Sequence, residues 1–284
     1  MNPTYQSGFY APGRGTALHP ELWRGCVGAW NPGLGNTGLS LRDWSGNQNN
    51  GTLTNFALTG STSNWVPSKG GYALAFDGTN DWVSAVGPTL LSEISITVWA
   101  KSISTASQNM VTRRLKAVFD DLNYVFAIDS TKFVFAFTAA SNNYHVWTST
   151  GTASSLGVLD GNWHLLSAVF TYGTGSSLEI RVDGKAPIAG SWTSGTGNAT
   201  HLNNPSETFA IGKELYSPSN FWNGQLGEMR IYNRRITPNV NTLLATRPGI
   251  AYELAPRKFY SLPAAAGNPT GNLINNLQSI RLGL

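Results

Sequence analysis

Short apolar segments with a two-residue period recur through the middle of this chain, and turn residues separate each from the next. Ile94, Ile96 and Val98 alternate with polar residues, and residues 133–137 carry three Phe at alternate positions. Because successive side chains of a strand point to opposite faces, each such segment presents one apolar face. Further segments of this character are 72–86, broken at Asp77-Gly78, and 124–128, 163–170, 178–182, 209–212 and 225–232. The succession predicts an all-β protein in which two antiparallel sheets pack together.

Composition agrees with a protein that buries a large core. Of the 284 residues only 12% are charged, whereas 11% are aromatic, including 10 Trp. A chain this aromatic and this lightly charged has ample apolar surface to bury, which excludes intrinsic disorder. No apolar run approaches the ~18 residues of a membrane span, so no membrane contact is expected. The N-terminus has no apolar h-region, so no signal peptide is expected, and the single Cys26 excludes an intrachain disulfide.

The chain divides into a body and two ends that are rich in Pro. We expect residues 1–25 to be an extended N-terminal arm, residues 26–246 to be the sandwich domain, and residues 247–284 to be an extended C-terminal tail. Thr237 followed by Pro is the start signal of a short helix at the end of the body. Apolar residues at helical spacing over 273–280 predict a second short helix in the tail, which needs a partner surface to be stable.

The net charge of +4 is unevenly distributed. Residues 26–229 have a net charge of −3, whereas residues 230–284 have a net charge of +6. A basic tail can bind an acidic protein surface or nucleic acid. Because these cations are spread out without a dense Lys/Arg run, nucleic acid is not the expected partner.

Seven short motifs occur in a characteristic order. They are RDWSGNQNNGTL (42–53), LAFDGTNDWV (74–83), ISITVWAK (94–101), WHLLSAVF (163–170), LEIRVDGK (178–185), FAIGKE (209–214) and FWNGQLGEMRIYNRRITPNVNTLLA (221–245). This order resembles the laminin-G-like, concanavalin A-like jelly-roll superfamily. The resemblance covers most of the chain and implies a two-sheet antiparallel jelly-roll sandwich whose edges and end loops are the working surfaces. The fold by itself does not fix the activity.

The segment ATRPGIAYELAPRKFYSL (245–262) resembles the ends of laminin-G-like proteins in bacteriophage and viral genomes. This resemblance implies a virion structural protein, in capsid decoration or in a tail or fibre, that is exposed on the particle and forms a homo-oligomer. The tail residues expected to contact neighbouring virion proteins or further copies of the chain are Arg247, Tyr252, Arg257, Lys258, Phe259 and Tyr260. The alternative is a lectin-type adhesin outside a virion, which binds a cell-surface or environmental glycan.

Catalytic groupings are missing from the sequence. Retaining glycoside hydrolases of this fold carry a Glu-x-Asp-x-x-Glu arrangement, with carboxyls ~5–5.5 Å apart. None of the 15 acidic residues makes that pattern, and Glu179 and Asp183 are expected to be solvent-facing charges. The four His lack metal-site spacing, and Cys26 is expected to be a small buried apolar residue. The sequence therefore predicts no catalytic residues and no enzyme, with a glycoside hydrolase as the third hypothesis.

Calcium is the one cofactor that the resemblance implies, because laminin-G-like domains often bind this ion at the sandwich rim. Oxygen ligands could come from Asp43, Asn47, Asp77, Asn80 and Asp81. The alternative is that these residues bond their own backbone in Asx-type turns. No cofactor is required by any motif.

Aromatic residues in or near loops are the candidates for a glycan or partner surface, because a flat ring can stack on the C–H face of a sugar. The candidates are Tyr144, Trp147, Trp192, Tyr216 and Trp222. The alternative for each is packing in the wide core of the sandwich, where aromatic side chains supply much of the buried area.

Overall fold

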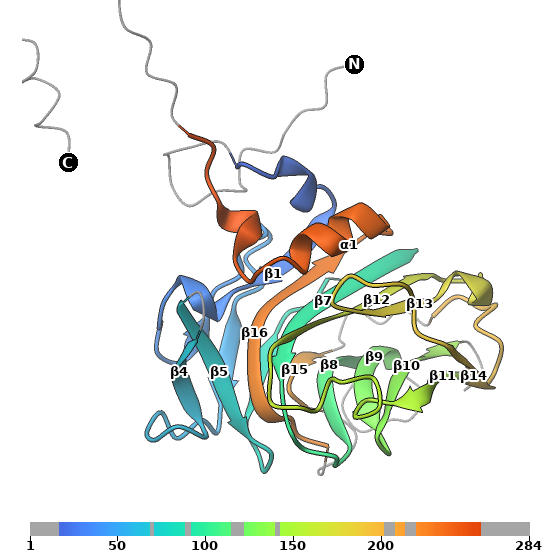
Figure 1. The fold of residues 1–284 in the computed structure, drawn as a ribbon, viewed down its shortest axis with the longest axis horizontal. Coiled ribbons are helices and arrows are strands. Elements are labelled where there is room, and N and C mark those ends of the chain that lie inside the picture. The colour runs from blue at the N-terminus through green and yellow to red at the C-terminus, as the bar shows by residue number, and fades with distance from the viewer. Residues whose placement is uncertain are drawn as a thin grey trace, which may run out of the picture.

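The structure, a computed structural model, describes residues 17–68, 71–88, 92–114, 122–139, 143–201, 208–213 and 220–256. These residues form two antiparallel sheets that pack face to face (Figure 1). The strands of the first sheet are β1 (Cys26–Trp30), β4 (Asn64–Ser68), β5 (Gly71–Asp77), β7 (Glu93–Lys101), β12 (His164–Thr171), β13 (Glu179–Val182) and β16 (Asn223–Tyr232). Their order is β13-β12-β7-β16-β5-β4, with β1 paired to β16.

The second sheet is the larger of the two. Its described strands are β2 (Ser40–Leu41), β3 (Gly51–Thr54), β6 (Trp82–Ala85), β8 (Gln108–Arg114), β9 (Leu122–Asp129), β10 (Lys132–Ala139), β11 (Asn143–Thr152), β14 (Gly190–Ser194) and β15 (Thr208–Ile211). Their order is β14-β11-β10-β9-β8-β15-β6-β3-β2. The two sheets confirm the predicted antiparallel sandwich.

The core lies between the sheets and is built from the residues that follow the two-residue period. Phe133, Phe135 and Phe137 are all completely buried on the inner face of β10, as the alternation predicts. Phe135 and Phe137 contact Phe170 of the opposite sheet, with ring centroids 5.4 and 5.6 Å apart. Each fully buried Phe stabilises the fold by about 1.5–3 kcal/mol. The contacts between aromatic rings therefore join the two sheets.

One helix covers part of the outer face of the first sheet, over β7 and β12 (Figure 1). Helix α1 (Pro238–Leu244) follows Thr237, whose hydroxyl accepts a hydrogen bond from the Val240 N–H at 3.3 Å. Val240 and Leu244 pack in one cluster with Trp99 of β7. This confirms the predicted helix start. No described helix is long and apolar enough to cross a bilayer.

Four short 3-10 helices also occur among the described residues. They are η1 (Pro20–Leu22), η2 (Pro32–Leu34), η4 (Gly175–Ser177) and η5 (Ile250–Tyr252). Helices η1 and η5 belong to the segments that were expected to be extended arms.

The described parts of those two segments pack on the sandwich, which corrects the expected boundaries. Leu22 and Trp23 of the N-terminal segment are buried, as are Ile250 and Ala251 of the C-terminal segment. Their apolar side chains cover the outer face of the first sheet beside α1. The packed body therefore runs from 17 to 256 through the described residues. The predicted tail helix, with Arg257, Lys258, Phe259 and Tyr260, lies outside them.

A buried ion pair on β16 joins both terminal segments to the sheet. Arg230 is completely buried and donates to Glu228 through Nε and to the Leu22 carbonyl through a terminal nitrogen at 3.2 Å. Its guanidinium lies 4.2 Å from the ring centroid of Trp23. The other oxygen of Glu228 accepts a hydrogen bond from the Gly249 N–H at 2.7 Å. One pair of side chains thus holds the beginning and the end of the body together.

The two terminal segments also lie beside each other. Ala17 and Leu254 form an antiparallel bridge, and the Leu18 N–H donates to the Glu253 carbonyl at 2.7 Å. Arg247 and Glu253 form an ion pair within the C-terminal segment. The chain therefore enters and leaves the described body at the same place.

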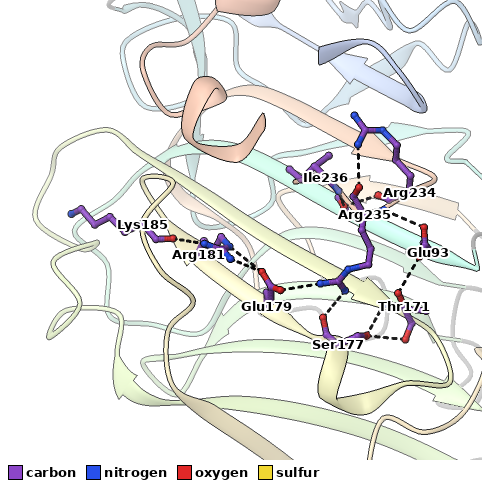
Figure 2. A network of polar contacts seen from close by, with 10 residues as sticks. Glu93, Thr171, Ser177, Glu179, Arg181, Lys185, Arg234, Arg235 and Ile236 are labelled. Carbon is purple, nitrogen blue, oxygen red and sulfur yellow. Dashed lines mark hydrogen bonds and ion pairs between the residues drawn. The ribbon is translucent and has the colours of Figure 1, made fainter. Parts of the chain in front are cut away.

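An ion-pair network fastens the segment after β16 to the β13 edge of the first sheet (Figure 2). Glu179 accepts from Arg181 at 2.6 Å and from Arg235 at 3.0 Å. Arg235 also donates to the Ser177 carbonyl at 2.6 Å, and its backbone N–H donates to Glu93 at 3.3 Å. Glu179, expected to face solvent, instead has both carboxylate oxygens on arginines because two distant segments meet at this edge.

Candidate binding surface

Two aromatic surface pockets lie on either side of residues 31–35, the loop that contains η2. The Arg42 pocket is lined mainly by Asn31, Leu34, Thr37, Arg42, Trp44 and Trp65. The Trp163 pocket is lined mainly by Asn31, Ser68, Tyr72, Trp99, Trp163 and Pro248. Asn31 lines both pockets, so the two are neighbours across one loop.

The loop between the pockets is fixed by local bonds. The side-chain oxygen of Asn31 accepts a hydrogen bond from the Gly33 N–H at 2.8 Å, which caps η2. Gly71 of β5 has a φ of +124°, and a Cβ at this position would overlap the Gly33 carbonyl. The Trp65 indole donates to the Gly38 carbonyl at 2.8 Å and holds the chain that follows. The close approach of two backbones therefore sets the position of the loop.

The Trp163 pocket has a glycine in its floor. Gly227 lies in β16 where the pairing with β7 shifts register between Leu226 and Met229. A Cβ on Gly227 would lie 3.2 Å from the Cβ of Trp99 and 3.4 Å from the Trp163 ring. The missing side chain lets both indoles approach the sheet. Trp163 stays partly exposed, whereas Trp99 is buried.

In the Arg42 pocket a guanidinium lies over an indole. The guanidinium carbon of Arg42 is 4.2 Å from the ring centroid of Trp44, within the range of a cation–π contact. The edge of Tyr252 approaches the same indole, at 6.3 Å between centroids. Trp44 is partly exposed and Arg42 is exposed. This pocket therefore presents an aromatic surface and a positive charge to solvent.

Asp43 and Asn47, two of the predicted calcium ligands, are instead anchors of their own loop. One Asp43 oxygen accepts from the N–H groups of Ala29 at 2.9 Å and Ser45 at 2.8 Å. The other oxygen accepts from the Ser45 hydroxyl at 2.8 Å and from the Asn49 N–H at 3.0 Å. The side-chain amide of Asn47 donates to a backbone carbonyl at 3.0 Å. The oxygen acceptors of Asp43 are therefore already used by the protein.

Asp77, Asn80 and Asp81, the other predicted ligands, form a turn. Asp77 accepts from the N–H groups of Thr79 at 2.7 Å and Asn80 at 3.2 Å, as in an Asx turn. Asp81 is completely buried and accepts from the Ser63 hydroxyl at 2.9 Å and the Asp77 N–H at 3.0 Å. Burial raises the pKa of Asp81 above its ordinary value. In the described part of the chain no three His, Cys, Asp or Glu gather around a cation position.

The predicted aromatic candidates are mostly parts of the core. Trp147 is 6% exposed and Trp222 is 1% exposed, and both belong to the cluster between the sheets, which rules them out as exposed platforms in this conformation. Trp192 is partly exposed, but its indole donates to the Gly175 carbonyl at 3.0 Å and its ring contacts Phe137 and Phe170. Tyr144 is partly exposed on β11, beside a small cluster on the outer face of the second sheet. Tyr216 lies outside the described residues.

The described nucleophile and acid–base candidates are engaged in structural contacts. Burial raises the pKa of the Cys26 thiol to about 11, so the thiol stays protonated and is a poor nucleophile near neutral pH. His164 lies between Asp183 and Asp160, which bond its two ring nitrogens at 3.0 and 3.1 Å. Asp183, expected to face solvent, also accepts from the Leu165 N–H at 3.0 Å. This geometry favours a structural role for all four residues.

Comparison with solved structures gives the same fold. The chain is similar to the binding domain of Paraclostridial Mosquitocidal Protein 1, with a TM-score of 0.56 and 11% identity over 79% of this chain and 52% of that one. It is similar to the binding domain of botulinum neurotoxin DC in complex with rat synaptotagmin II, with a TM-score of 0.52 and 11% identity over 79% and 52% of the two chains. At these identities the likeness shows the fold alone. The chain spans about half the length of these binding domains.

Sequence comparison identifies the family. No curated protein sequence matches the chain significantly. The profile of the concanavalin A-like lectin/glucanases superfamily matches residues 77–239, which is more than half of the chain. This segment contains most strands of both sheets described above. The chain therefore belongs to the concanavalin A-like lectin/glucanase superfamily.

Proposed function

We propose that this chain is a non-catalytic, lectin-type binding protein that binds a glycan across the surface around the two small pockets beside residues 31–35. The observation that carries the proposal is the partly exposed pair of indoles, Trp44 and Trp163, on either side of Asn31. Ligand sites combine apolar and aromatic walls with a few polar groups, and a sugar ring matches that combination. The C–H face of a sugar ring can pack on an indole, while the hydroxyl groups of the sugar form hydrogen bonds with a side-chain amide.

The surroundings of the pockets support the same proposal. Leu34 is 45% exposed and Tyr72 is 40% exposed, so large apolar side chains border the pockets at the surface. Exposed apolar side chains that cluster around a pocket are typical of interaction sites. Membership of a superfamily of lectins and glucanases fits glycan recognition, and the similar solved structures are binding domains.

Binding to a broad glycan array tests the proposal. We expect Trp163→Ala and Trp44→Ala each to weaken binding of the recognised glycan by about five- to 150-fold, because base stacking on an aromatic ring, a comparable contact, is worth ~1–3 kcal/mol. Tyr144→Ala, which removes a partly exposed aromatic residue of the second sheet, is the matched control and should bind normally. Circular dichroism establishes that each variant folds.

Three results would each contradict a part of this proposal. Loss of binding in the Tyr144 variant with normal binding in both Trp variants would move the site to the second sheet. No binding to any glycan of the array would remove the lectin function, and turnover of a polysaccharide would remove the non-catalytic assignment.

A role in a phage virion is the second candidate, favoured by the position of the two ends of the described body. Ala17 and Leu254 lie side by side. A partner that binds either terminal segment therefore contacts the body at the same place. In this proposal the protein decorates a capsid or belongs to a tail or fibre, binds neighbouring virion proteins or its own copies there, and exposes the pockets on the particle.

Incorporation into virions that lack the protein tests this second candidate. The full chain is compared with a 17–256 variant, which retains the described terminal residues that pack on the body. The proposal expects incorporation of the full chain and loss of incorporation in the variant. Equal incorporation of both would exclude the terminal segments from attachment.

A further inference from the structure

Arg42 directly follows β2 and has no carboxylate beside it, in contrast to the arginines of the ion pairs described above. Arg230 is paired with Glu228, and Arg181 and Arg235 are both paired with Glu179. Among the described residues, no Asp or Glu lies within ion-pair distance of Arg42. Its guanidinium instead lies over Trp44 at 4.2 Å. The side chain is thus held by an apolar surface, while its N–H donors remain exposed.

The neighbouring acid does not neutralise this charge. Asp43 follows Arg42 directly, but its carboxylate is buried and accepts four hydrogen bonds from the protein. Arg42 is therefore the one charged residue among those that line the Arg42 pocket in the described chain. The Trp163 pocket has no charged residue in its described lining.

We infer that the Arg42 pocket binds a carboxylated sugar, a statement that rests on the proposed glycan-binding function. The planar guanidinium presents parallel N–H donors that match the two oxygens of a carboxylate, and such charge-assisted bonds are stronger than neutral ones. The contact with Trp44 fixes the guanidinium before the ligand arrives, so little freedom is lost on binding. The Trp163 pocket has no charged residue in its described lining, so it should contribute equally to the affinity for charged and neutral ligands.

Isothermal titration of the full chain with two matched pairs of probes tests this inference. The pairs are sialyllactose with lactose, and oligogalacturonate with its methyl ester, which keeps the sugar rings and removes the charge. We expect the carboxylated member of at least one pair to bind about tenfold more tightly than its neutral counterpart. The preference should fall at high ionic strength, because Arg42 is exposed.

Variants at three positions separate this inference from simpler explanations. Arg42→Gln should abolish the preference for the carboxylated probe. Arg42→Lys, which keeps the positive charge but loses the parallel N–H donors of the guanidinium, should keep part of the preference. Arg24→Gln removes the charge of another exposed arginine and should leave the preference intact. Trp163→Ala should weaken both members of a pair by the same factor.

Two outcomes overturn the inference while the lectin function stands. They are equal binding of the neutral and carboxylated probes, and a preference for the carboxylated probe that Arg42→Gln leaves unchanged. Absence of binding to every glycan would instead contradict the lectin function itself.

Discussion

At the scale of single residues, the most demanding feature is the completely buried Arg230. A buried charge is tolerated only when other groups compensate it, and here Glu228 and the Leu22 carbonyl do so. The rings of Trp23 and Tyr252 lie 4.2 and 4.9 Å from the guanidinium. The same side chain therefore binds the sheet to both terminal segments.

Removal of Arg230 should be strongly destabilising. We expect Arg230→Ala to lower the free energy of unfolding by about 3–5 kcal/mol, because it leaves the Glu228 carboxylate buried without its partner. Arg235→Ala, at a partly exposed ion pair, should cost about 1 kcal/mol or less. Urea denaturation of the two variants gives both values. Equal losses would show that burial of the Arg230 pair does not matter.

At the scale of secondary-structure elements, His164 connects three segments. It begins β12, and its ring nitrogens bond Asp160 of the preceding loop and Asp183 after β13. Lys185 also lies near Asp183, at 3.8 Å. Burial lowers the pKa of His164, but the hydrogen bonds to Asp183 and Asp160 outweigh this effect, so the net shift is upward.

This shift predicts how stability depends on pH. A histidine whose pKa is raised by folding stabilises the folded state fully at a pH below its ordinary value of 6.5, and the contribution is lost as pH rises through the folded pKa. The loss of unfolding free energy caused by His164→Asn should therefore be larger at pH 5.5 than at pH 8.5. Denaturant titrations at both values provide the measurement. A loss that is independent of pH would show that folding does not raise the pKa of His164, and a larger loss at pH 8.5 would show that folding lowers it.

The strands were predictable to different degrees, for a physical reason. Strands β7 and β13 alternate apolar and polar residues, because one face meets the core. Strands β9 and β10 are apolar at most positions and buried on both faces, and their largest side chains recur every second residue. Strand β8 (QNMVTRR) has no such pattern, yet all seven residues are buried. Its polar side chains find partners inside the protein, as when Gln108 donates to the Ser104 carbonyl at 3.0 Å. A buried strand with internal partners has no periodic signal in its sequence.

At the scale of the whole molecule, both terminal segments complete the body. Leu22, Trp23, Ile250 and Ala251 share one buried cluster with residues of α1 and the first sheet. The segments that contain these residues are rich in Pro and Gly, and this composition predicted extended arms. Apolar side chains at a few positions were sufficient to fix the segments, because the outer face of the sheet offers an apolar surface.

Truncation tests this role. A variant of residues 26–246 should be several kcal/mol less stable than a variant of residues 17–256, because each large apolar side chain that it loses contributes about 1.5–3 kcal/mol on burial. Thermal unfolding of the two variants, compared with the full chain, checks this expectation. A 26–246 variant as stable as the 17–256 variant would show that the terminal segments are dispensable.

The sequence alone determined the fold class, the superfamily and the start of α1, because local alternation and capping depend on residues close together in the chain. Tertiary structure decided the candidate site. Trp222 is in the core while Trp163 is at the surface, although both are Trp residues next to strands. Only the contact of distant segments decides which indole is covered and that Arg235 meets the carboxylate of Glu179. Sequence spacing carries no record of those contacts.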